Sequence, residues 1–295
     1  MRRRRDERKG DEQGMILVNV LMFVAIASGL VLLMISREEL ALDRSLRGRE
    51  AARAAAIVRG GELSAISALR KDAREAPEVD HSGERWASIG AKGVAIDGGS
   101  FDLAVSDAEG RFNVNALRSG EVAPVLIFQK LATIAGLDEV QMTQAIAYVR
   151  SQGPVTDVRP IRLLPGVDQD AIARLERMVT ALPGNTQINL NAADQELLAI
   201  LFDDPIVAER LVAIRKRNGQ ITLRDLSDQK VTQPPGTAFR SGTFWVRVRA
   251  TIGETAQDGA TLIQRKREED GTVEVLPVAR WRNAAVPPEA PVVGG

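Results

Sequence analysis

The sequence predicts an α+β protein with a long N-terminal helix, an antiparallel sheet and a large all-α segment inserted into that sheet. An uncharged run, residues 15–35, passes into a stretch of good helix formers that contains no proline before Pro77. Alternating apolar residues occur in two distant regions, residues 99–117 and 242–282, and helical periodicity fills the region between them. The sheet is therefore expected to be assembled from segments on either side of residues 116–236.

Composition narrows the possible functions. The 295 residues suffice for one large domain or two smaller ones, and 39 basic residues balance 39 acidic residues. A net charge of zero gives no global reason to expect nucleic acid or acidic lipid as a partner. The absence of cysteine excludes disulfides, zinc fingers and thiol nucleophiles. His81 is the only histidine, and its polar Gly/Ser-containing surroundings indicate a surface loop.

The N-terminus has the features of a membrane segment. Residues 1–13 carry six basic and four acidic side chains, whereas residues 15–35 carry none. Twenty-one helical residues span about 31 Å, close to the hydrocarbon thickness of a bilayer. A buried core helix is the alternative, but such helices are seldom apolar on every face over this length. The arginines precede the run, which places the N-terminus in the cytoplasm and the bulk of the chain outside.

The segment does not resemble a cleaved secretory signal. Such a signal has a shorter apolar stretch and a small-residue cleavage site, and neither is present here. The helix is expected to continue toward residue 59 or beyond, with Gly60-Gly61 as its first weak point. Helical spacing then resumes through Leu63, Ile66 and Leu69.

Strand patterns lie in two parts of the chain. Residues 99–105 and 112–114, on either side of the turn sequence "DAEG", predict a hairpin. Three runs near the C-terminus, "GTFWVRVRATIG", "GATLIQRKRE" and "GTVEVLPVARW", predict a meander joined by turns. The tail "NAAVPPEAPVVGG" has no pattern and is predicted to be disordered.

The intervening block carries helix signals. Residues 169–182 form an apolar stripe that stops at Pro183-Gly184. Asn191 is expected to cap the next helix, with Asp194 three residues on. Asp204, Pro205 and Gly219 delimit another helix, and a capping box of Thr222 and Asp225 opens a third.

A short sequence pattern occurs twice in the chain. "FNVNAL" (112–117) and "INLNAA" (188–193) both run apolar-Asn-apolar-Asn-Ala into a helix. The preferred interpretation is structural, with asparagine capping a helix after an extended segment.

The N-terminus resembles the class III signal of type IV pilins and pseudopilins, which has a basic leader ending in glycine, then an apolar segment, then a long helix. The resemblance implies that a prepilin peptidase cuts between Gly14 and Met15 and methylates the new amine of Met15. Most such subunits carry glutamate at the fifth mature position, where it pairs with the N-terminal ammonium of a neighbouring subunit. Asn19 occupies that position here and is neutral, which suits a subunit that caps a filament. Alternatively, Asn19 is an ordinary polar residue of a membrane helix.

A second resemblance gives the rival hypothesis. Residues 188–226 resemble the helix-hairpin-helix module of membrane-anchored DNA-uptake receptors. Such hairpins hold phosphate on backbone N–H groups at a glycine-containing turn, but here the turn reads "FDDPIVAE" with two aspartates. Residues 185–230 contain six Lys/Arg and seven Asp/Glu, and the cluster Arg215-Lys216-Arg217 is explained as a solvated helix end. DNA binding is therefore not expected.

The order of motifs along almost the whole chain resembles the type II secretion minor pseudopilin K family, also called general secretion pathway protein K. After the leader and the anchor without a fifth-position glutamate come four matching stretches: "SDAEGRFNVNAL", "IRLLPGVDQDAIARLERMVTALPGNTQINLNAA", "AIRKRNGQITLRDL" and "SGTFWVRVRATI". The resemblance implies a pilin-like fold in which the long helix packs on the sheet and a large helical domain is inserted.

The resemblance also implies a role and partners. The protein would be a single-pass inner-membrane protein with a periplasmic soluble domain, and later a subunit at the tip of the pseudopilus. There it would start pseudopilus assembly and support protein secretion across the outer membrane. Its partners would be minor pseudopilins I and J, other pseudopilins and the prepilin peptidase, and not nucleic acid.

The expected organisation follows from the anchor, the strand segments and the insert. Its parts are a cleaved cytoplasmic leader (1–14), a transmembrane half (15–35) and a periplasmic half (36–76) of the N-terminal helix, a pilin-like sheet (77–115 and 237–282), an inserted helical domain (116–236) and a disordered tail (283–295).

Catalytic and metal residues are not predicted. The sequence contains no G-x-S-x-G, P-loop, H-E-x-x-H or Gly-rich dinucleotide turn, so an enzyme is not expected. Many family members have an acidic run associated with calcium after the first helical pair, but here that position reads "IAYVRSQG". The pairs Asp168 with Asp170 and Asp203 with Asp204 are interpreted as helix caps. Calcium is thus implied by the resemblance alone, and no ligands are assigned.

Overall fold

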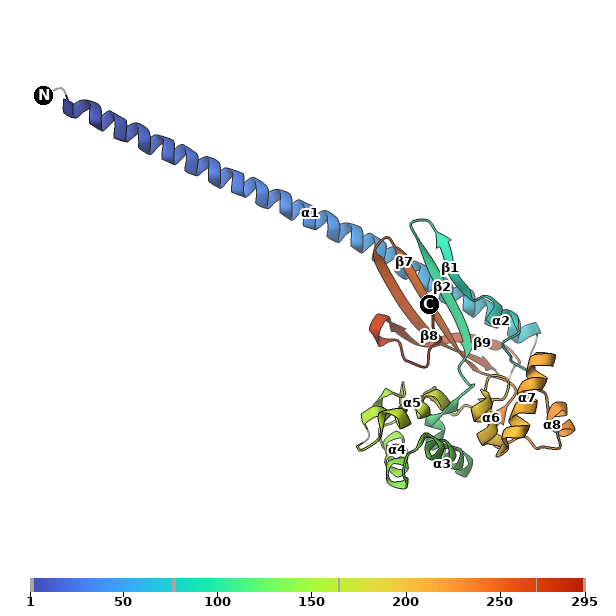
Figure 1. Cartoon of the computed structure of the whole chain (residues 1–295). Coiled ribbons are helices and arrows are strands. Elements are labelled where there is room, and N and C mark those ends of the chain that lie inside the picture. Colours follow the sequence, from blue (N-terminus) through green and yellow to red (C-terminus); the bar gives the residue numbers. More distant parts are fainter. Residues whose placement is uncertain (1–2, 76–77, 164, 269, 294–295) are drawn as a thin grey trace. The chain divides into compact units, whose positions relative to one another are not determined.

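The computed structural model describes the backbone of residues 3–75, 78–163, 165–268 and 270–293, with side chains from Leu17 onward. The chain divides into two compact units, residues 1–53 and 54–295. Helix α1 (Arg3–Glu75) supplies all of the described first unit and the beginning of the second. The predicted combination of a long helix, an antiparallel sheet and an inserted helical domain is confirmed, although the insert also contains short strands (Figure 1).

The sheet has five antiparallel strands in the order β1-β2-β7-β8-β9. The strands are β1 (Ala91–Ile96), β2 (Gly99–Asp107), β7 (Thr243–Ile252), β8 (Thr255–Arg267) and β9 (Val273–Arg282). The meander β7-β8-β9 is as predicted. The hairpin predicted for residues 99–114 is wrong, because β2 pairs with β1 through the turn at Gly98, which has φ of 75°.

One face of the sheet packs on the second part of α1. Ala65, Ile66 and Leu69 share a hydrophobic cluster with residues from β2, β7, β8 and β9. Gly61, expected to weaken the helix, instead lies against β7: a Cβ there would come within 2.7 Å of Val248 Cγ2. Gly61 therefore permits a close helix–sheet approach, and α1 continues without interruption to Glu75.

Ion pairs tie the same helix to the sheet. Glu62 is buried on α1 and accepts two hydrogen bonds from Arg280 on β9, at 2.8 and 2.9 Å. It also accepts a hydrogen bond from Thr261 on β8. The short helix α2 (Arg85–Ser88) follows α1 and buries Trp86 against Phe244, with ring centroids 5.0 Å apart.

The insert consists of two halves, each closed by a two-stranded parallel ribbon. The first runs from β3 (Phe112–Asn113) to β4 (Val179–Thr180), and the second from β5 (Ile188–Asn189) to β6 (Thr237–Ala238). The helices of the first half are η1 (Val114–Arg118), α3 (Val122–Ala135), α4 (Glu139–Ser151), η2 (Arg159–Leu163) and α5 (Gln169–Met178). Those of the second half are α6 (Gln195–Phe202), α7 (Pro205–Asn218) and α8 (Leu223–Asp228).

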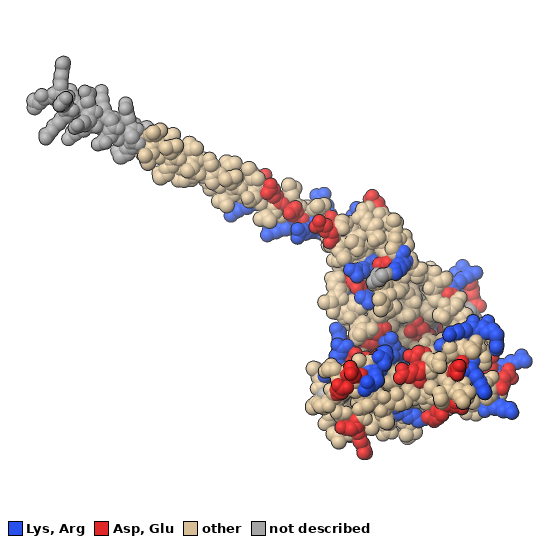
Figure 2. All heavy atoms as spheres, viewed as in Figure 1, with Lys and Arg blue, Asp and Glu red and all other residues tan. Residues whose placement is uncertain are grey.

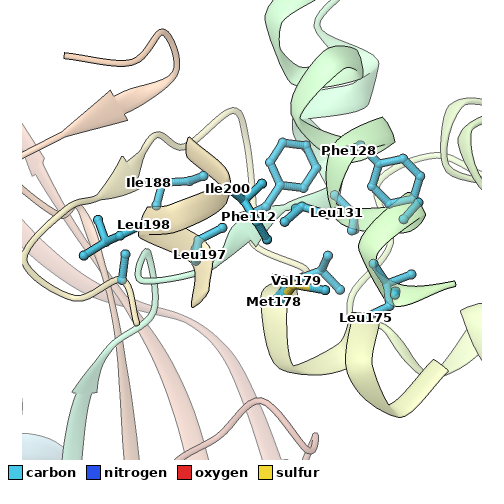
Figure 3. Packing of buried hydrophobic residues seen from close by; sticks show 14 of the residues in the cluster. Phe112, Phe128, Leu131, Leu175, Met178, Val179, Ile188, Leu197, Leu198 and Ile200 are labelled. Carbon is cyan, nitrogen blue, oxygen red and sulfur yellow. The ribbon is translucent and has the colours of Figure 1, made fainter. Parts of the chain in front are cut away.

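The two halves share one hydrophobic core. Phe112, Phe128 and Leu131 of the first half lie in the same cluster as Ile188 and Leu197 of the second, and Figure 3 shows them pointing toward one another. The helix predicted to reach residue 182 ends at Met178, because the next residues form β4 and pair with β3. Pairing between distant segments has overridden the local helical pattern.

The pattern shared by residues 112–117 and 188–193 forms an equivalent structure in each half of the insert. Asn113 and Asn189 each accept a hydrogen bond from the backbone N–H two residues on, as in a cap. The helix cap assigned to Asn191 is wrong: α6 begins at Gln195, and its N-cap is Asp194, which accepts from Leu197 N–H at 2.8 Å. Asn191 is buried, and its side chain forms hydrogen bonds with the backbone of Ile221.

The predicted disorder of the tail, residues 283–295, is wrong for residues 283–293. Helix η3 (Asn283–Ala285) follows β9, and the residues after it cover the sheet face opposite α1. Ala290 and Val293 are buried there, and Ala290 shares a cluster with Trp245 and Leu262. Composition alone missed this packing, because small apolar residues between prolines give no periodic signal.

Candidate functional site: an apolar anchor and a buried polar hub

The first unit offers an apolar helix surface. Gly14 and Met15 belong to residues 1–16, whose side chains lie outside the described residues. Asn19 lies on α1 and is exposed, as are its neighbours Val18 and Val20. The helix is long and apolar enough to cross a membrane, and Figure 2 shows the corresponding uncharged surface. Because this surface is apolar on all sides, it requires lipid or other helices around it.

The second unit is organised around Arg265, a buried arginine on β8. Its Nη1 donates to Asp72 Oδ2 at 2.9 Å, and its Nη2 donates to both carboxylate oxygens of Asp80 at 2.5 Å. Nη2 also donates to the carbonyl of Ser241 at 2.8 Å, and the guanidinium lies 5.0 Å from the centre of the Phe244 ring. Arg265 therefore joins the end of α1, the loop after it and the sheet.

The same network reaches the second half of the insert. Asp80 donates its backbone N–H to Phe239 and accepts from the Ser241 N–H. Asn189 of β5 donates to the Asp80 carbonyl at 3.0 Å and to Asp107 Oδ2 at 2.7 Å. We call the group of Asp72, Asp80, Asp107, Asn189, Ser241 and Arg265 the polar hub.

Burial shapes the titration of the carboxyl groups in and beside the hub. It raises the pKa of Asp72 to about 6; nearby Glu84 adds to this, and Arg265 opposes it. Burial likewise raises the pKa of Asp107 to about 6, although Ser241 donates a hydrogen bond to it. Glu109, next to Asp107, has its pKa raised by burial to about 7. Ionisation of these three carboxyl groups therefore costs more free energy in the folded protein than in the unfolded chain.

The hub does not fit calcium. Among the described residues, Asp72, Asp80 and Glu84 offer carboxylate oxygens that lie within 4.8 Å of one another. Arg265 already pairs with Asp72 and Asp80, and Glu84 accepts from the His81 N–H at 2.9 Å and from Trp86 Nε1 at 2.8 Å. A calcium ion needs six to eight oxygen ligands, whereas two of these three carboxylates already pair with the Arg265 guanidinium.

The acidic pairs interpreted as helix caps lie at helix ends, as expected. Asp204 caps α7 by accepting from the N–H groups of Ile206 and Val207. Asp203 ends α6 with φ of 53° and pairs with Lys130 at 2.6 Å. Asp168 stands at the N-cap position of α5 but makes no capping hydrogen bond with its side chain, and Asp170 lies in the first turn.

The geometry of the α6–α7 hairpin argues against the DNA-binding alternative. The N–H groups of Ile206 and Val207, which would hold phosphate, donate to the Asp204 carboxylate instead. The interpretation of Arg215 as part of a solvated helix end is wrong, because its Nη1 donates to the carbonyls of Leu190, Asn191 and Ala193. Burial lowers the pKa of Arg215. Lys216 and Arg217 remain exposed.

Sequence reasoning did not identify the hub, although one signal was available. Thr261, Ile263 and Arg265 occupy the same face of β8, which packs toward α1. An arginine at a strand position that faces the core requires a buried acidic partner, because an unpaired buried charge is unfavourable. The pattern does not reveal which acid, since Asp72 and Asp80 lie more than 180 residues away along the chain.

Comparison with known proteins identifies relatives over nearly the whole chain. No protein-family model matches. The type II secretion system protein K of Pseudomonas aeruginosa is 28% identical, over 90% of this chain and 92% of that protein. The proteins of the same name from Klebsiella pneumoniae and Pectobacterium carotovorum are 25% and 23% identical, over 89% and 83% of this chain.

A solved structure shares the fold. It is the crystal structure of the GspK-GspI-GspJ complex from the type 2 secretion system of enterotoxigenic Escherichia coli. The match has a TM-score of 0.63 at 18% identity and covers 81% of this chain and 99% of the chain in that structure. The pilin-like fold with an inserted helical domain and the resemblance to type II secretion minor pseudopilin K are therefore both confirmed.

Proposed function

We propose that this chain is a minor pseudopilin at the tip of a type II secretion pseudopilus, where it starts assembly of the pseudopilus. The observation that carries the proposal is the similarity to type II secretion system protein K along nine tenths of the chain. The protein would be structural, not enzymatic, and would support protein secretion across the outer membrane.

The anchor supports an inner-membrane location. In the part of the chain that the structure describes, one helix near the N-terminus has the length and apolarity to span a bilayer, and basic residues precede it. By the positive-inside rule, the N-terminus would lie in the cytoplasm and residues 36–295 in the periplasm. A prepilin peptidase would cut between Gly14 and Met15 and methylate Met15, which leaves the apolar part of α1 in the mature protein.

Asn19 supports a place at the tip. In a filament of stacked apolar helices, a fifth-position carboxylate would neutralise the N-terminal ammonium of the neighbouring subunit. The amide of Asn19 cannot supply this charge, so a copy of this chain is poorly suited to repeat along the filament. A subunit at the end has one neighbour fewer and does not need the carboxylate.

The proposed partners are minor pseudopilins I and J. The related structure was solved as a complex that contains GspI and GspJ together with GspK, and this chain shares its fold. A surface complementary to those two subunits is therefore expected in the second unit or along the first. Copies of the major pseudopilin would form the pseudopilus beneath these three subunits.

Co-purification tests the proposal. The full chain, tagged at its C-terminus, is expressed with the minor pseudopilins I and J of the same bacterium and purified in mild detergent. We expect a complex with one copy of each, and we expect deletion of the chain to leave secreted enzymes in the periplasm. Purification of the chain without I and J, with secretion unaffected by the deletion, would contradict the proposal.

A further inference from the structure

The segment after η3 forms a strap across the sheet. We call residues 286–293 the C-terminal strap. Ala290 and Val293 are 4% and 7% exposed, whereas Val292 between them is 85% exposed. Val286 and Ala290 pack against Trp245, Leu262 and other residues of the sheet face opposite α1.

Few polar contacts hold the strap. Arg247 on β7 donates to the Pro291 carbonyl at 3.1 Å, and Val158 in the insert donates its N–H to Glu289 Oε1 at 3.0 Å. Prolines at three of the eight strap positions have no N–H to donate, so the strap cannot pair as a sheet strand does. Its attachment therefore depends on small buried side chains and on these two anchors.

The closed strap leaves buried polar atoms unsatisfied. A cavity of about 440 Å³ lies between the strap, the sheet and the insert. Thr180 Oγ1, Trp245 Nε1 and Glu289 Oε2 belong to residues that line it, are buried, and have no hydrogen-bond partner among the described residues. Each comes from a different part: Thr180 from the insert, Trp245 from the sheet and Glu289 from the strap. Wherever water in this cavity does not reach them, such groups raise the free energy of the closed state.

Glu289 shows this cost most clearly. The residue is 7% exposed, one carboxylate oxygen has a single donor, and the other has none among the described residues. Burial raises the pKa of this carboxyl group. Opening of the strap would hydrate Glu289 and Trp245 together, while the core between α1 and the sheet would remain intact.

We propose that the sheet face opposite α1 is a docking surface for an extended, proline-containing protein segment with one acidic residue, and that the strap occupies it in cis and can be displaced. The strap itself shows what the surface accepts. Small apolar residues of the strap pack near Trp245 and Trp281, whose ring centroids lie 5.1 Å apart. The Glu289 carboxylate accepts a hydrogen bond from the Val158 N–H. A partner segment of the same chemistry would take the place of the strap.

Thiol labelling tests whether the strap opens. The full chain has no cysteine, so Ala290→Cys, Val292→Cys and Ala132→Cys each carry one thiol. Ala132 is fully buried in the core of the insert and reports unfolding of that core, whereas Val292 reports unhindered reaction. We expect Ala290→Cys to react more slowly than Val292→Cys but at least about 100-fold faster than Ala132→Cys under native conditions. Equal protection of Ala290→Cys and Ala132→Cys would overturn the proposal.

A peptide with the strap sequence VPPEAPVV tests docking. Fluorescently labelled peptide is titrated into Ala290→Asp, in which a buried charge disfavours the closed strap, and into the wild-type chain. We expect saturable binding to Ala290→Asp, and at least about 10-fold weaker binding to wild type because its own strap competes. If Ala290→Asp does not fold, the chain ending at Ala285 replaces it. Absence of peptide binding by a folded, strap-free variant would overturn the docking surface.

Discussion

Asn115 and Asn191 make the same pair of hydrogen bonds in the two halves of the insert. The Asn115 side chain accepts from the Val155 N–H and donates to the Val155 carbonyl, both at 2.9 Å. The Asn191 side chain accepts from the Ile221 N–H at 2.5 Å and donates to the Ile221 carbonyl at 3.1 Å. Each asparagine thereby satisfies both backbone groups of one residue between two helices.

Replacement of Asn191 tests the importance of this arrangement. Asn191→Ala leaves the Ile221 N–H and carbonyl without their partner in the core, so we expect a loss of about 3 kcal/mol in the free energy of unfolding. Denaturant unfolding of the full chain in detergent measures the loss. The matched control is Asn185→Ala at an exposed position, which is expected to change stability by less than about 0.5 kcal/mol. Equal effects would show that the paired hydrogen bonds contribute little.

Removal of Arg265 tests the polar hub. Arg265→Met leaves Asp72 and Asp80 buried without their cation, and we expect a loss of about 3–5 kcal/mol in the free energy of unfolding. Arg265→Lys should rescue little, because one ammonium cannot reproduce the hydrogen bonds to Asp72, Asp80 and Ser241 together. Arg267→Met, at an exposed position two residues on, is the control. A stable Arg265→Met variant would contradict a structural role for the hub.

The raised pKa of Glu109 predicts how the free energy of unfolding depends on pH. Its pKa is raised from 4.5 to about 7 by burial, so the folded state binds this proton more tightly than the unfolded state. The resulting stabilisation is fully present below about pH 4.5 and is lost as the pH rises through about 7, a change of about 3 kcal/mol.

Glu109→Gln should remove that loss. We expect the free energy of unfolding of the variant to fall less than that of the wild type between pH 5 and pH 8. Asp72 and Asp107 act in the same direction in both proteins, so only the difference between the two profiles reports Glu109. Glu121→Gln, at an exposed position, should leave the profile of the wild type unchanged. Parallel profiles for wild type and Glu109→Gln would refute the prediction.

Asn19→Glu tests the proposed tip position. The new carboxylate could pair with the N-terminal ammonium of a neighbouring subunit, so further subunits could assemble where the wild-type chain ends the filament. Immunogold labelling should find wild-type protein only at pseudopilus ends and the variant also along the shaft. Labelling confined to the ends in both cases would indicate that Asn19 does not determine the position.

Features encoded by neighbouring residues could be predicted from the sequence. The cap at Asp204 with Pro205 and Gly219, and the capping box of Thr222 and Asp225, are present as expected. Each depends on contacts within one or a few turns of a helix. The alternation in β7, β8 and β9 likewise fixes a meander, because short turns leave few other pairings.

Features that depend on distant partners could not be predicted. β3 is two residues long and pairs with β4 across 67 residues, so it was assigned to a hairpin with its neighbour β2. Asn191 was assigned as a cap because its partner Ile221 lies 30 residues on. The sequence predicts disorder for the strap for the same reason, because the order of the strap comes from Trp245 and the rest of the sheet face.

Intact mass tests the pseudopilin account most directly. The full chain is expressed with and without its cognate prepilin peptidase, and the N-terminus of each product is analysed. The account predicts loss of residues 1–14 and a methylated amine on Met15 only when the peptidase is present, with Gly14→Leu uncut as the control. An uncut wild-type chain in the presence of a peptidase that cleaves other pseudopilins of the same bacterium would contradict the account.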